Sequence, residues 1–205
     1  MRNCIRNFSN FTLPLRSNIF AMIYPIQIIG CPVLRKIAPD ITPDYPNLPQ
    51  LIADLYETLE VTEGVGLAAP QVGVSVRVFV IDASPFADED PSMANFRRTF
   101  INAHIEERMG DKEYFNEGCL SIPGIHEDVL REPKIRMRYV DEQFQPHVEE
   151  FEGIAARIIQ HEYDHLDGML FTDRVSPLRK QLLKSKLNAI QKGRFKVNYR
   201  YKMAR

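Results

Sequence analysis

The chain has 205 residues, a formal net charge of −1 and 44% hydrophobic residues, which suits one globular domain with a sizeable core. No run of residues approaches the roughly 18 apolar residues of a transmembrane helix, so we expect no membrane span. The three cysteines are too few, and odd in number, for a disulfide framework. They favour a reducing compartment.

Charge is unevenly distributed along the chain. Residues 1–39 carry five basic residues and no acid, whereas residues 40–175 carry all 27 acids and 11 basic residues. Residues 176–205 carry ten basic residues and no acid. A basic end on an acidic body predicts contact with a polyanion, although a solvated charged surface is the common alternative.

The N-terminus is interpreted as an extension, residues 1–21, that the folded body does not need. An apolar run at residues 19–29 resembles a lipoprotein signal, but Pro25 and Gln27 interrupt it where a signal core is continuous. An acid-free organellar presequence is the other alternative. We favour a body that starts at Met22 and covers residues 22–175, followed by a basic helix and tail over residues 176–205 of the same domain.

Hydrophobic periodicity predicts the elements in chain order. A helix that begins near Pro49 places one apolar face on the core, through Leu48, Leu51, Ile52, Leu55 and Leu59. Strands or strand-like runs are predicted at residues 26–35, 74–82, 99–105, 129–140 and 148–151, the first of which runs into a turn at Pro32. Residues 83–95 are polar and contain prolines, so we expect a surface loop there.

The C-terminal part is predicted to form a helix from Ser176-Pro177 to about Gln191, followed by a short closing strand within residues 195–203. The apolar stripe expected on this helix comprises Leu178, Leu182, Leu183, Leu187 and Ile190. Strands in succession with few helices predict an α+β fold. We expect antiparallel sheets wrapped around a central helix, described next, plus this C-terminal helix.

That central helix carries the pattern H-E-x-x-H at His161, Glu162 and His165. The preceding residues contain neither Gly nor Pro, and Gly168 is a plausible helix end. Residues four apart lie on one helix face, so both imidazoles can reach one metal ion. Glu162 lies about 100° around the helix from His161, close enough to act on a water beside the metal. A buried helix with two hydrogen-bonded histidines is the alternative.

A catalytic metal site needs a third protein ligand. In a zinc metallopeptidase of the extended motif, a histidine would stand where this chain has Phe171, and no Glu follows Glu162. Only Asp167 and Asp173 remain downstream as carboxylates, so that reading lacks a ligand. Cys119 is the candidate upstream. A thiolate ligand is the economical role for it, with a buried small side chain or a nucleophile as alternatives.

Three segments together resemble the signature motifs of bacterial peptide deformylases. They are Gly-Val-Gly-Leu-Ala-Ala-Pro-Gln at 64–71, Glu-Gly-Cys-Leu-Ser at 117–121 and His-Glu-Tyr-Asp-His at 161–165. Residues 30–35 are similar to the N-terminal turn of that family. The resemblance covers about residues 22–175, with the motifs in the family's order and spacing.

This resemblance implies a hydrolase that removes the formyl group from the initiator methionine of new polypeptides and releases formate. It implies that Cys119, His161 and His165 bind one divalent metal ion, most often Fe2+, with Zn2+ or Ni2+ possible. Glu162 is then the general base and acid. The Gln71 side chain and the Leu120 backbone N–H stabilise the oxyanion.

The resemblance also implies the substrate contacts. Gly66 allows close approach of the substrate peptide, and the methionine pocket is formed by Val65, Phe115, Leu120 and Ile158, for which core packing is the alternative. Arg131 resembles an arginine that helps to fix the site. In some relatives the C-terminal helix contacts the ribosome, and the basic tail predicts the same here. A catalytically silent, ribosome-associated metal-binding module is the remaining alternative.

Overall fold

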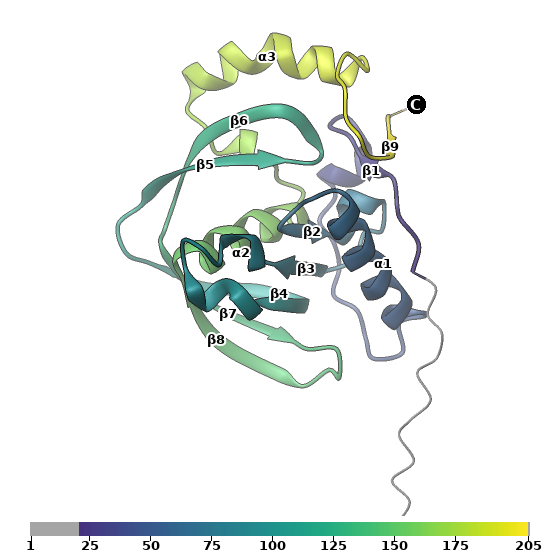
Figure 1. Cartoon of the computed structure of the whole chain (residues 1–205), viewed down its shortest axis with the longest axis vertical. Coiled ribbons are helices and arrows are strands. Elements are labelled where there is room, and N and C mark those ends of the chain that lie inside the picture. The colour runs from purple at the N-terminus through teal and green to yellow at the C-terminus, as the bar shows by residue number, and fades with distance from the viewer. Residues whose placement is uncertain (1–20, 205) are drawn as a thin grey trace, which may run out of the picture.

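The helix that carries the two histidines, α2 (Gly153–Leu166), lies between a five-stranded sheet and a separate two-stranded hairpin (Figure 1). The computed structural model describes residues 21–204. The expected α+β fold, with antiparallel sheets around the central helix, is confirmed. The prediction for residues 1–21 falls outside the described residues except for Ala21.

The main sheet is antiparallel throughout, in the order β2-β3-β4-β7-β8. Its strands are Gly66–Ala68, Val78–Asp82, Arg97–Met109, Lys134–Val140 and Pro146–Glu152. Ile135, Met137 and Tyr139 of β7 are buried while Arg136 and Arg138 are exposed, as predicted for a strand with one solvated face. The inward face packs with Ala155, Ala156, Ile158 and Ile159 of α2 in one apolar cluster.

Two predicted strands are shorter than expected. A third predicted run was wrong, because it covers parts of two separate strands. The run at 74–82 is a strand only over Val78–Asp82, and the run at 26–35 is a strand only over β1 (Ile26–Gln27). The run at 129–140 spans the end of one strand and the whole of another. Pro133 lies between them, and a residue without a backbone N–H cannot continue a ladder.

The hairpin formed by β5 (Glu113–Cys119) and β6 (Ile122–Arg131) was largely missed by the sequence analysis. Its two strands carry polar residues at many positions, so β5 has no clear apolar alternation. Arg157 of α2 ties the helix to this hairpin, because its guanidinium donates to the carbonyls of Val129 and Glu113 at 3.1 and 2.8 Å. The hairpin therefore covers the face of α2 opposite the main sheet.

The first helix, α1 (Leu48–Val61), forms as predicted, with its five expected apolar residues buried. The third, α3 (Pro177–Gln191), also has the predicted bounds, with Ser176 as its N-cap. The apolar stripe expected on α3 was partly wrong. Leu183 and Ile190 are buried, whereas Leu178 and Leu182 are 66% and 60% exposed.

The chain after α3 turns back to the N-terminal strand (Figure 1). Within the predicted run 195–203, only β9 (Tyr201–Lys202) is a strand, and it pairs in parallel with β1. The expected loop at 83–95 contains two short 3-10 turns, Ser84–Phe86 and Pro91–Asn95. None of the helices among residues 21–204 is both long and apolar enough to cross a bilayer.

The end of α2 depends on Gly168, which adopts a φ of +69°. A side chain at this position would be strained, and its Cβ would lie 2.8 Å from the backbone carbonyl carbon of Arg35. This contact holds the end of the helix against the turn at Pro32–Arg35. The predicted helix stop therefore also fixes where the N-terminal turn packs.

We expect Gly168→Ala to lower the free energy of unfolding by roughly 2–4 kcal/mol, because backbone strain and a backbone clash add. Gly153→Ala is the matched control, since Gly153 also has a positive φ (+57°) but no atom within 4 Å of its added Cβ. It should cost only about 1 kcal/mol. Urea denaturation of both variants measures the difference, and equal losses would contradict this account of Gly168.

Candidate metal centre and active site

Three side chains that could hold a metal ion meet where β5 ends beside α2. One donor atom from each of Cys119, His161 and His165 can be chosen so that all three lie within 4.8 Å of one another. The Cys119 Sγ lies 3.4 Å from the His165 Nε2. The helix supplies both imidazoles from one face, one turn apart, and the last residue of β5 brings the sulfur to them.

The hydrogen bonds of the histidines suit a bound cation. The Nδ1 atom of His161 lies 2.9 Å from Oε2 of Glu117, which leaves its Nε2 for a metal ion. The Nδ1 atom of His165 is buried and has no hydrogen-bond partner among residues 21–204. A thiolate and two imidazoles form a donor set that accepts Fe2+, Zn2+ or Ni2+. The residues present therefore fit one divalent ion.

Electrostatics keep the sulfur in the form that binds metal. Burial opposes the thiolate, but the neighbouring His165 and His161 outweigh it and lower the pKa of Cys119 to about 5. The pKa of His161 is raised well above its usual value, because the contacts with Cys119 and Glu117 outweigh its own burial. At neutral pH Cys119 is therefore a thiolate.

A buried ionic network holds this cluster in place. Arg131, only 2% exposed, donates to both carboxylate oxygens of Glu117 at 2.7 and 2.9 Å. It also donates to Asp164 of α2 at 2.8 Å. Arg157 adds a 3.3 Å contact to Glu117, and Arg174 pairs with Asp164. Burial would raise the pKa of Glu117, but Arg131 and His161 outweigh it and lower this pKa.

Sequence reasoning named Arg131 but missed Glu117 and Asp164 as functional residues. Both acids stand inside the recognised motifs, which gave no separate sign of their role. Their role could have been predicted from their position in segments that are expected to be buried. Buried acids require cationic partners, and Asp164 follows Glu162 on a helix that is predicted to be buried.

Glu162 lies beside the three donors in a different environment. Its carboxyl group is buried, and one of its oxygens has no hydrogen-bond partner in the part of the chain that the structure describes. Burial raises the pKa of Glu162 to about 7, despite the nearby imidazoles, which lower it. Gly66 faces this group, since a Cβ there would lie 2.5 Å from the Glu162 Oε1. A glycine is therefore needed for Glu162 to occupy this place.

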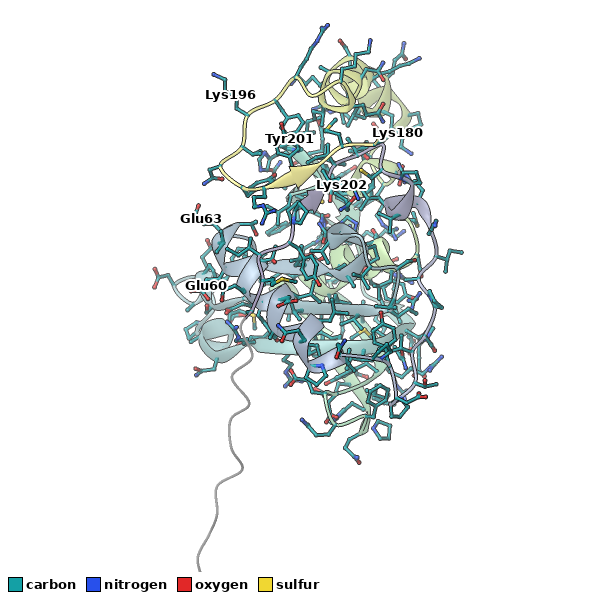
Figure 2. All side chains as sticks on the ribbon, turned by 90° about the vertical axis from the view of Figure 1, so that its right-hand side faces the viewer. Glu60, Glu63, Lys180, Lys196, Tyr201 and Lys202 are labelled. Atoms are coloured by element: carbon teal, nitrogen blue, oxygen red, sulfur yellow. The ribbon has the colours of Figure 1, made fainter. Side chains whose placement is uncertain are left out.

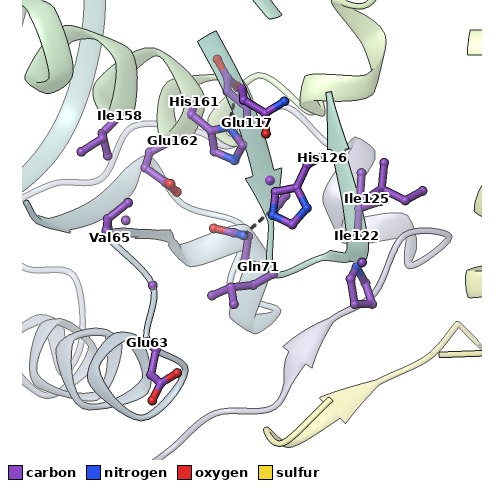
Figure 3. Close-up of a pocket in the computed structure, with 18 of the residues that line it drawn as sticks. Glu63, Val65, Gln71, Glu117, Ile122, Ile125, His126, Ile158, His161 and Glu162 are labelled. Atoms are coloured by element: carbon purple, nitrogen blue, oxygen red, sulfur yellow. Dashed lines mark hydrogen bonds and ion pairs between the residues drawn. The ribbon is translucent and has the colours of Figure 1, made fainter. Parts of the chain in front are cut away.

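Gln71 faces the cluster from the 3-10 turn Ala69–Val72. It is 1% exposed, and its Oε1 accepts a hydrogen bond from the Ala68 N–H at 2.8 Å. This fixes the amide so that its Nε2 points to the Cys119 Sγ, at 3.6 Å, and to Ser121. Figure 3 shows Gln71 across the pocket from His161 and Glu162.

A pocket of about 510 Å3 opens in front of these groups. All four residues expected to contact the methionine side chain line it, namely Val65, Phe115, Leu120 and Ile158. Figure 3 shows Val65 and Ile158 on the same side of the pocket as Glu162. His126 also lines it, and its ring packs over Gly118, where a Cβ would come within 2.6 Å. The structure thus brings the residues of the predicted site to one cavity, except His165, which is buried beside the Cys119 sulfur and does not line it.

The C-terminal segment also lines this pocket, through Lys196, Val197 and Tyr199. The hydroxyl of Tyr199 donates to the Leu120 carbonyl at 2.8 Å. Burial, followed by the charge of Cys119, raises the pKa of Tyr199 to about 12, so the hydroxyl keeps its proton at neutral pH. Sequence reasoning gave no sign of these contacts, because they depend on the pairing of β9 with β1.

A metallopeptidase site would need a third ligand downstream of the two histidines, and none of the described residues there is placed to provide it. Phe171 stacks on the His161 ring, with centroids 6.1 Å apart, at the place where the extended motif needs a histidine. Asp167 pairs with Arg77 at 2.8 Å, and Asp173 pairs with Arg35. Both downstream carboxylates are therefore engaged elsewhere.

We expect Arg131→Met to lower the free energy of unfolding by about 3–5 kcal/mol, because it leaves Glu117 and Asp164 buried without their main partner. Arg136→Met, on the exposed face of β7, is the control and should cost at most about 0.5 kcal/mol. Chemical denaturation of samples with matched metal content compares them.

The same network predicts a pH dependence. Folding lowers the pKa of Glu117, so unfolded protein binds the proton first and the stabilisation is present above the ordinary carboxyl value of 4.5. It is lost as the pH falls below that value. The difference in stability between wild type and Arg131→Met should therefore shrink in acid, and a difference that stays constant from neutral pH to pH 3 would contradict this.

Cys119→Ser should lose its metal, because a hydroxyl stays protonated where the thiolate bound. Cys31→Ser is the matched control, since Cys31 is buried near Lys202 and lies outside the three-residue cluster. Metal analysis after dialysis should find the ion in the control only. Full metal occupancy with unchanged coordination in Cys119→Ser would remove the sulfur from the site.

Comparisons with known proteins agree with this geometry. The family model described as polypeptide deformylase matches residues 23–181. The peptide deformylase of Flavobacterium johnsoniae is 52% identical over 190 residues, which cover 89% of this chain and 97% of that protein. The peptide deformylase of Christiangramia forsetii is 51% identical over 189 residues, covering 89% of this chain and 95% of that one.

Solved structures give the same result. The crystal structure of peptide deformylase from Thermotoga maritima superposes with a TM-score of 0.68 at 42% identity, over 76% of this chain and 99% of that chain. The crystal structure of a peptide deformylase from Legionella pneumophila gives 0.71 at 36% identity, over 83% and 96%. Sequence motifs, fold and site geometry agree, and the chain belongs to the polypeptide deformylase family.

Proposed function

We propose that Glu162 is the general base, and then the general acid, with which this deformylase hydrolyses the formyl amide of N-formylmethionyl peptides. In this role its carboxylate takes a proton from the attacking water and passes it to the leaving amine, so that formate and a free N-terminal methionine result. The observation that carries the proposal is a buried carboxyl group beside three atoms that could hold a metal ion. Its raised pKa, about 7, suits both steps at neutral pH.

One divalent cation would be held by Cys119, His161 and His165. When bound, it supplies Lewis-acid chemistry, lowering the pKa of a water and polarising the formyl oxygen. We propose ferrous iron as the working ion, as the family resemblance implies, with Zn2+ or Ni2+ as alternatives. The ligand types are compatible with each of the three.

Gln71 and Leu120 are proposed to stabilise the oxyanion that forms when water adds to the formyl carbon. The support for Gln71 is its buried amide, which the Ala68 N–H orients towards the cluster. The support for Leu120 is its position directly after Cys119, in the turn between β5 and β6. Each donor of this kind typically contributes about 10²–10³ in rate.

The methionine side chain is proposed to occupy the pocket beside these groups, against Val65, Phe115, Leu120 and Ile158. Apolar walls suit an unbranched thioether. Phe115 is held under the guanidinium of Arg157, whose Cζ lies 5.5 Å from the ring centroid. Gly66 lines the same pocket and leaves room for the Glu162 carboxyl group, which a Cβ at this position would contact at 2.5 Å.

We expect Glu162→Gln to retain its metal and to lose roughly 10²–10⁴ of kcat, because the ligands remain and the proton carrier is gone. Glu60→Gln is the control, since Glu60 is exposed on α1 and does not line the pocket. Formate release from a formyl-Met tripeptide, together with metal analysis, gives both quantities. Near wild-type turnover in Glu162→Gln would make the proposed role wrong.

A ribosome contact through the basic C-terminal region is the second part of the proposal, and it puts the enzyme in the bacterial cytoplasm. Lys180, Lys196 and Lys202 lie at the end of the molecule formed by α3 and β9 (Figure 2). An open cavity on α3, which we name the basic hollow, is lined by Gln181, Lys184, Ser185, Asn188, Ala189, Lys192 and Arg194. Cations beside amide and hydroxyl groups suit the phosphates of ribosomal RNA.

Not every basic residue of this region is available for such a contact. Arg179 donates to both oxygens of Glu127 at 2.7 and 2.6 Å, so its charge is already paired. The exposed Leu178 and Leu182 lie on the same helix and add an apolar surface. The three cations of the basic hollow are therefore the best residues with which to test the contact.

The combined change of Lys184, Lys192 and Arg194 to Gln should weaken co-sedimentation with ribosomes and lower the salt slope of binding by up to roughly three. A matched control changes Lys112, Lys134 and Arg136 to Gln. It removes the same number of positive charges, but from positions outside the C-terminal region. Turnover of free peptide should be unchanged in both. Equal co-sedimentation of the two variants at low salt would contradict the contact.

A further inference from the structure

The C-terminal segment after α3 enters the active site, and nothing in the proposed chemistry yet uses it. Its residues Lys196, Val197 and Tyr199 line the pocket that holds Glu162 and the metal-binding cluster. Tyr199 is half-buried and contacts one of the main apolar clusters of the core. A solvated tail would not make such contacts.

The position of this segment is fixed on both sides of Tyr199. After it, β9 pairs with β1, and the Ile26 and Ile28 N–H groups donate to the carbonyls of Arg200 and Lys202 at 2.9 Å. The rings of Phe195 and Tyr201 pack together with centroids 4.8 Å apart. The hydroxyl of Tyr199 is therefore held at a defined point over the site.

That point is the turn that follows the metal-binding cysteine. Cys119 pairs with Ile122, so Leu120 and Ser121 form the two-residue loop of the β5–β6 hairpin. The carbonyls of a tight loop have no partner in the strand ladder and require one from elsewhere. Here the Tyr199 hydroxyl donates to the Leu120 carbonyl, and the Ile29 N–H donates to the Ser121 carbonyl, each at 2.8 Å.

These two hydrogen bonds tie the loop to both ends of the chain. One comes from the N-terminal strand region and is made by backbone, which substitution cannot remove. The other comes from one side-chain hydroxyl near the C-terminus. The Leu120 carbonyl and the Leu120 N–H belong to successive peptide groups that share the Leu120 Cα, so the hydrogen bond that holds the carbonyl restricts the φ and ψ angles that set where the N–H points.

We propose that Tyr199 is a positioning residue of this enzyme, which orients the Leu120 peptide for stabilisation of the oxyanion. The proposal rests on the proposed function, in which the Leu120 N–H is one of the oxyanion donors. It makes the C-terminal segment a working part of the active site, separate from the charged surface of the basic hollow.

The variant Tyr199→Phe removes only the hydroxyl. Tyr201→Phe is the matched control, two residues further on in β9 and outside the pocket lining. Both are prepared as full-length, metal-loaded enzyme. The measurements are metal content, melting temperature, kcat and KM on a formyl-Met tripeptide, and hydrogen exchange of the Ile29 amide in the zinc-loaded form.

We expect Tyr199→Phe to keep its metal and its KM, and to lose roughly fivefold in kcat per bound metal, the factor for one neutral hydrogen bond. An unchanged KM with a lower kcat identifies an interaction made in the transition state. The Ile29 amide, which bonds the same loop, should exchange faster in this variant. Tyr201→Phe should match wild type in each measurement.

The proposal is overturned if kcat per metal and Ile29 exchange in Tyr199→Phe equal those of Tyr201→Phe. It is also overturned if Tyr199→Phe lowers only the melting temperature or the metal content, since Tyr199 would then be merely structural. Failure of the proposed function would be seen separately, because the wild-type enzyme would then release no formate. The hydrogen-exchange rate of the Ile29 amide would still report whether Tyr199 holds the loop.

Discussion

The site depends on the ionic interactions of one buried group, the carboxylate of Glu117. It lies on β5, two residues before Cys119, and it meets Arg131 of β6 and both Arg157 and His161 of α2. One acid thus joins the hairpin that carries the sulfur to the helix that carries the imidazoles. Its charge is compensated by groups that are themselves buried, so the loss of any one leaves a charge in a medium that cannot solvate it.

Two buried glutamates of this site show how partners decide protonation. Glu117 and Glu162 are 5% and 3% exposed, so burial alone would raise the pKa of both. Glu117 has two arginines and a histidine, and its pKa falls; it stays an anion that orients His161. Glu162 has no hydrogen bond to one oxygen among the described residues, and its pKa rises to about 7. One therefore serves structure and the other is suited to proton transfer.

Much of the fold and site followed from local sequence patterns. Helical spacing identified α1, α2 and α3, and the H-E-x-x-H pattern placed His161, Glu162 and His165 on one helix because that geometry is local. Cys119 followed from the need for a third ligand. The β5–β6 hairpin was missed because its strands are polar, and its place over α2 is set by long-range contacts of Arg131 and Arg157.

The remaining errors also have long-range causes. Periodicity on α3 included Leu178 and Leu182, yet only the half of the stripe that faces the hairpin finds a partner surface. The contacts of Tyr199 depend on the parallel pairing of β1 with β9, in which Ile26 lies beside Tyr201, 175 positions further along the chain. Spacing within one segment contains no information about such pairing, so neither feature was predictable from periodicity alone.

One sulfur and two imidazole nitrogens, held by the Glu117 network, are proposed to bind the catalytic ion. X-ray absorption spectroscopy at the metal edge of protein purified without oxygen tests this most directly. We expect one sulfur scatterer at about 2.3 Å, with nitrogen and oxygen atoms completing the coordination. A fully loaded protein whose spectrum contains only nitrogen and oxygen neighbours would contradict it.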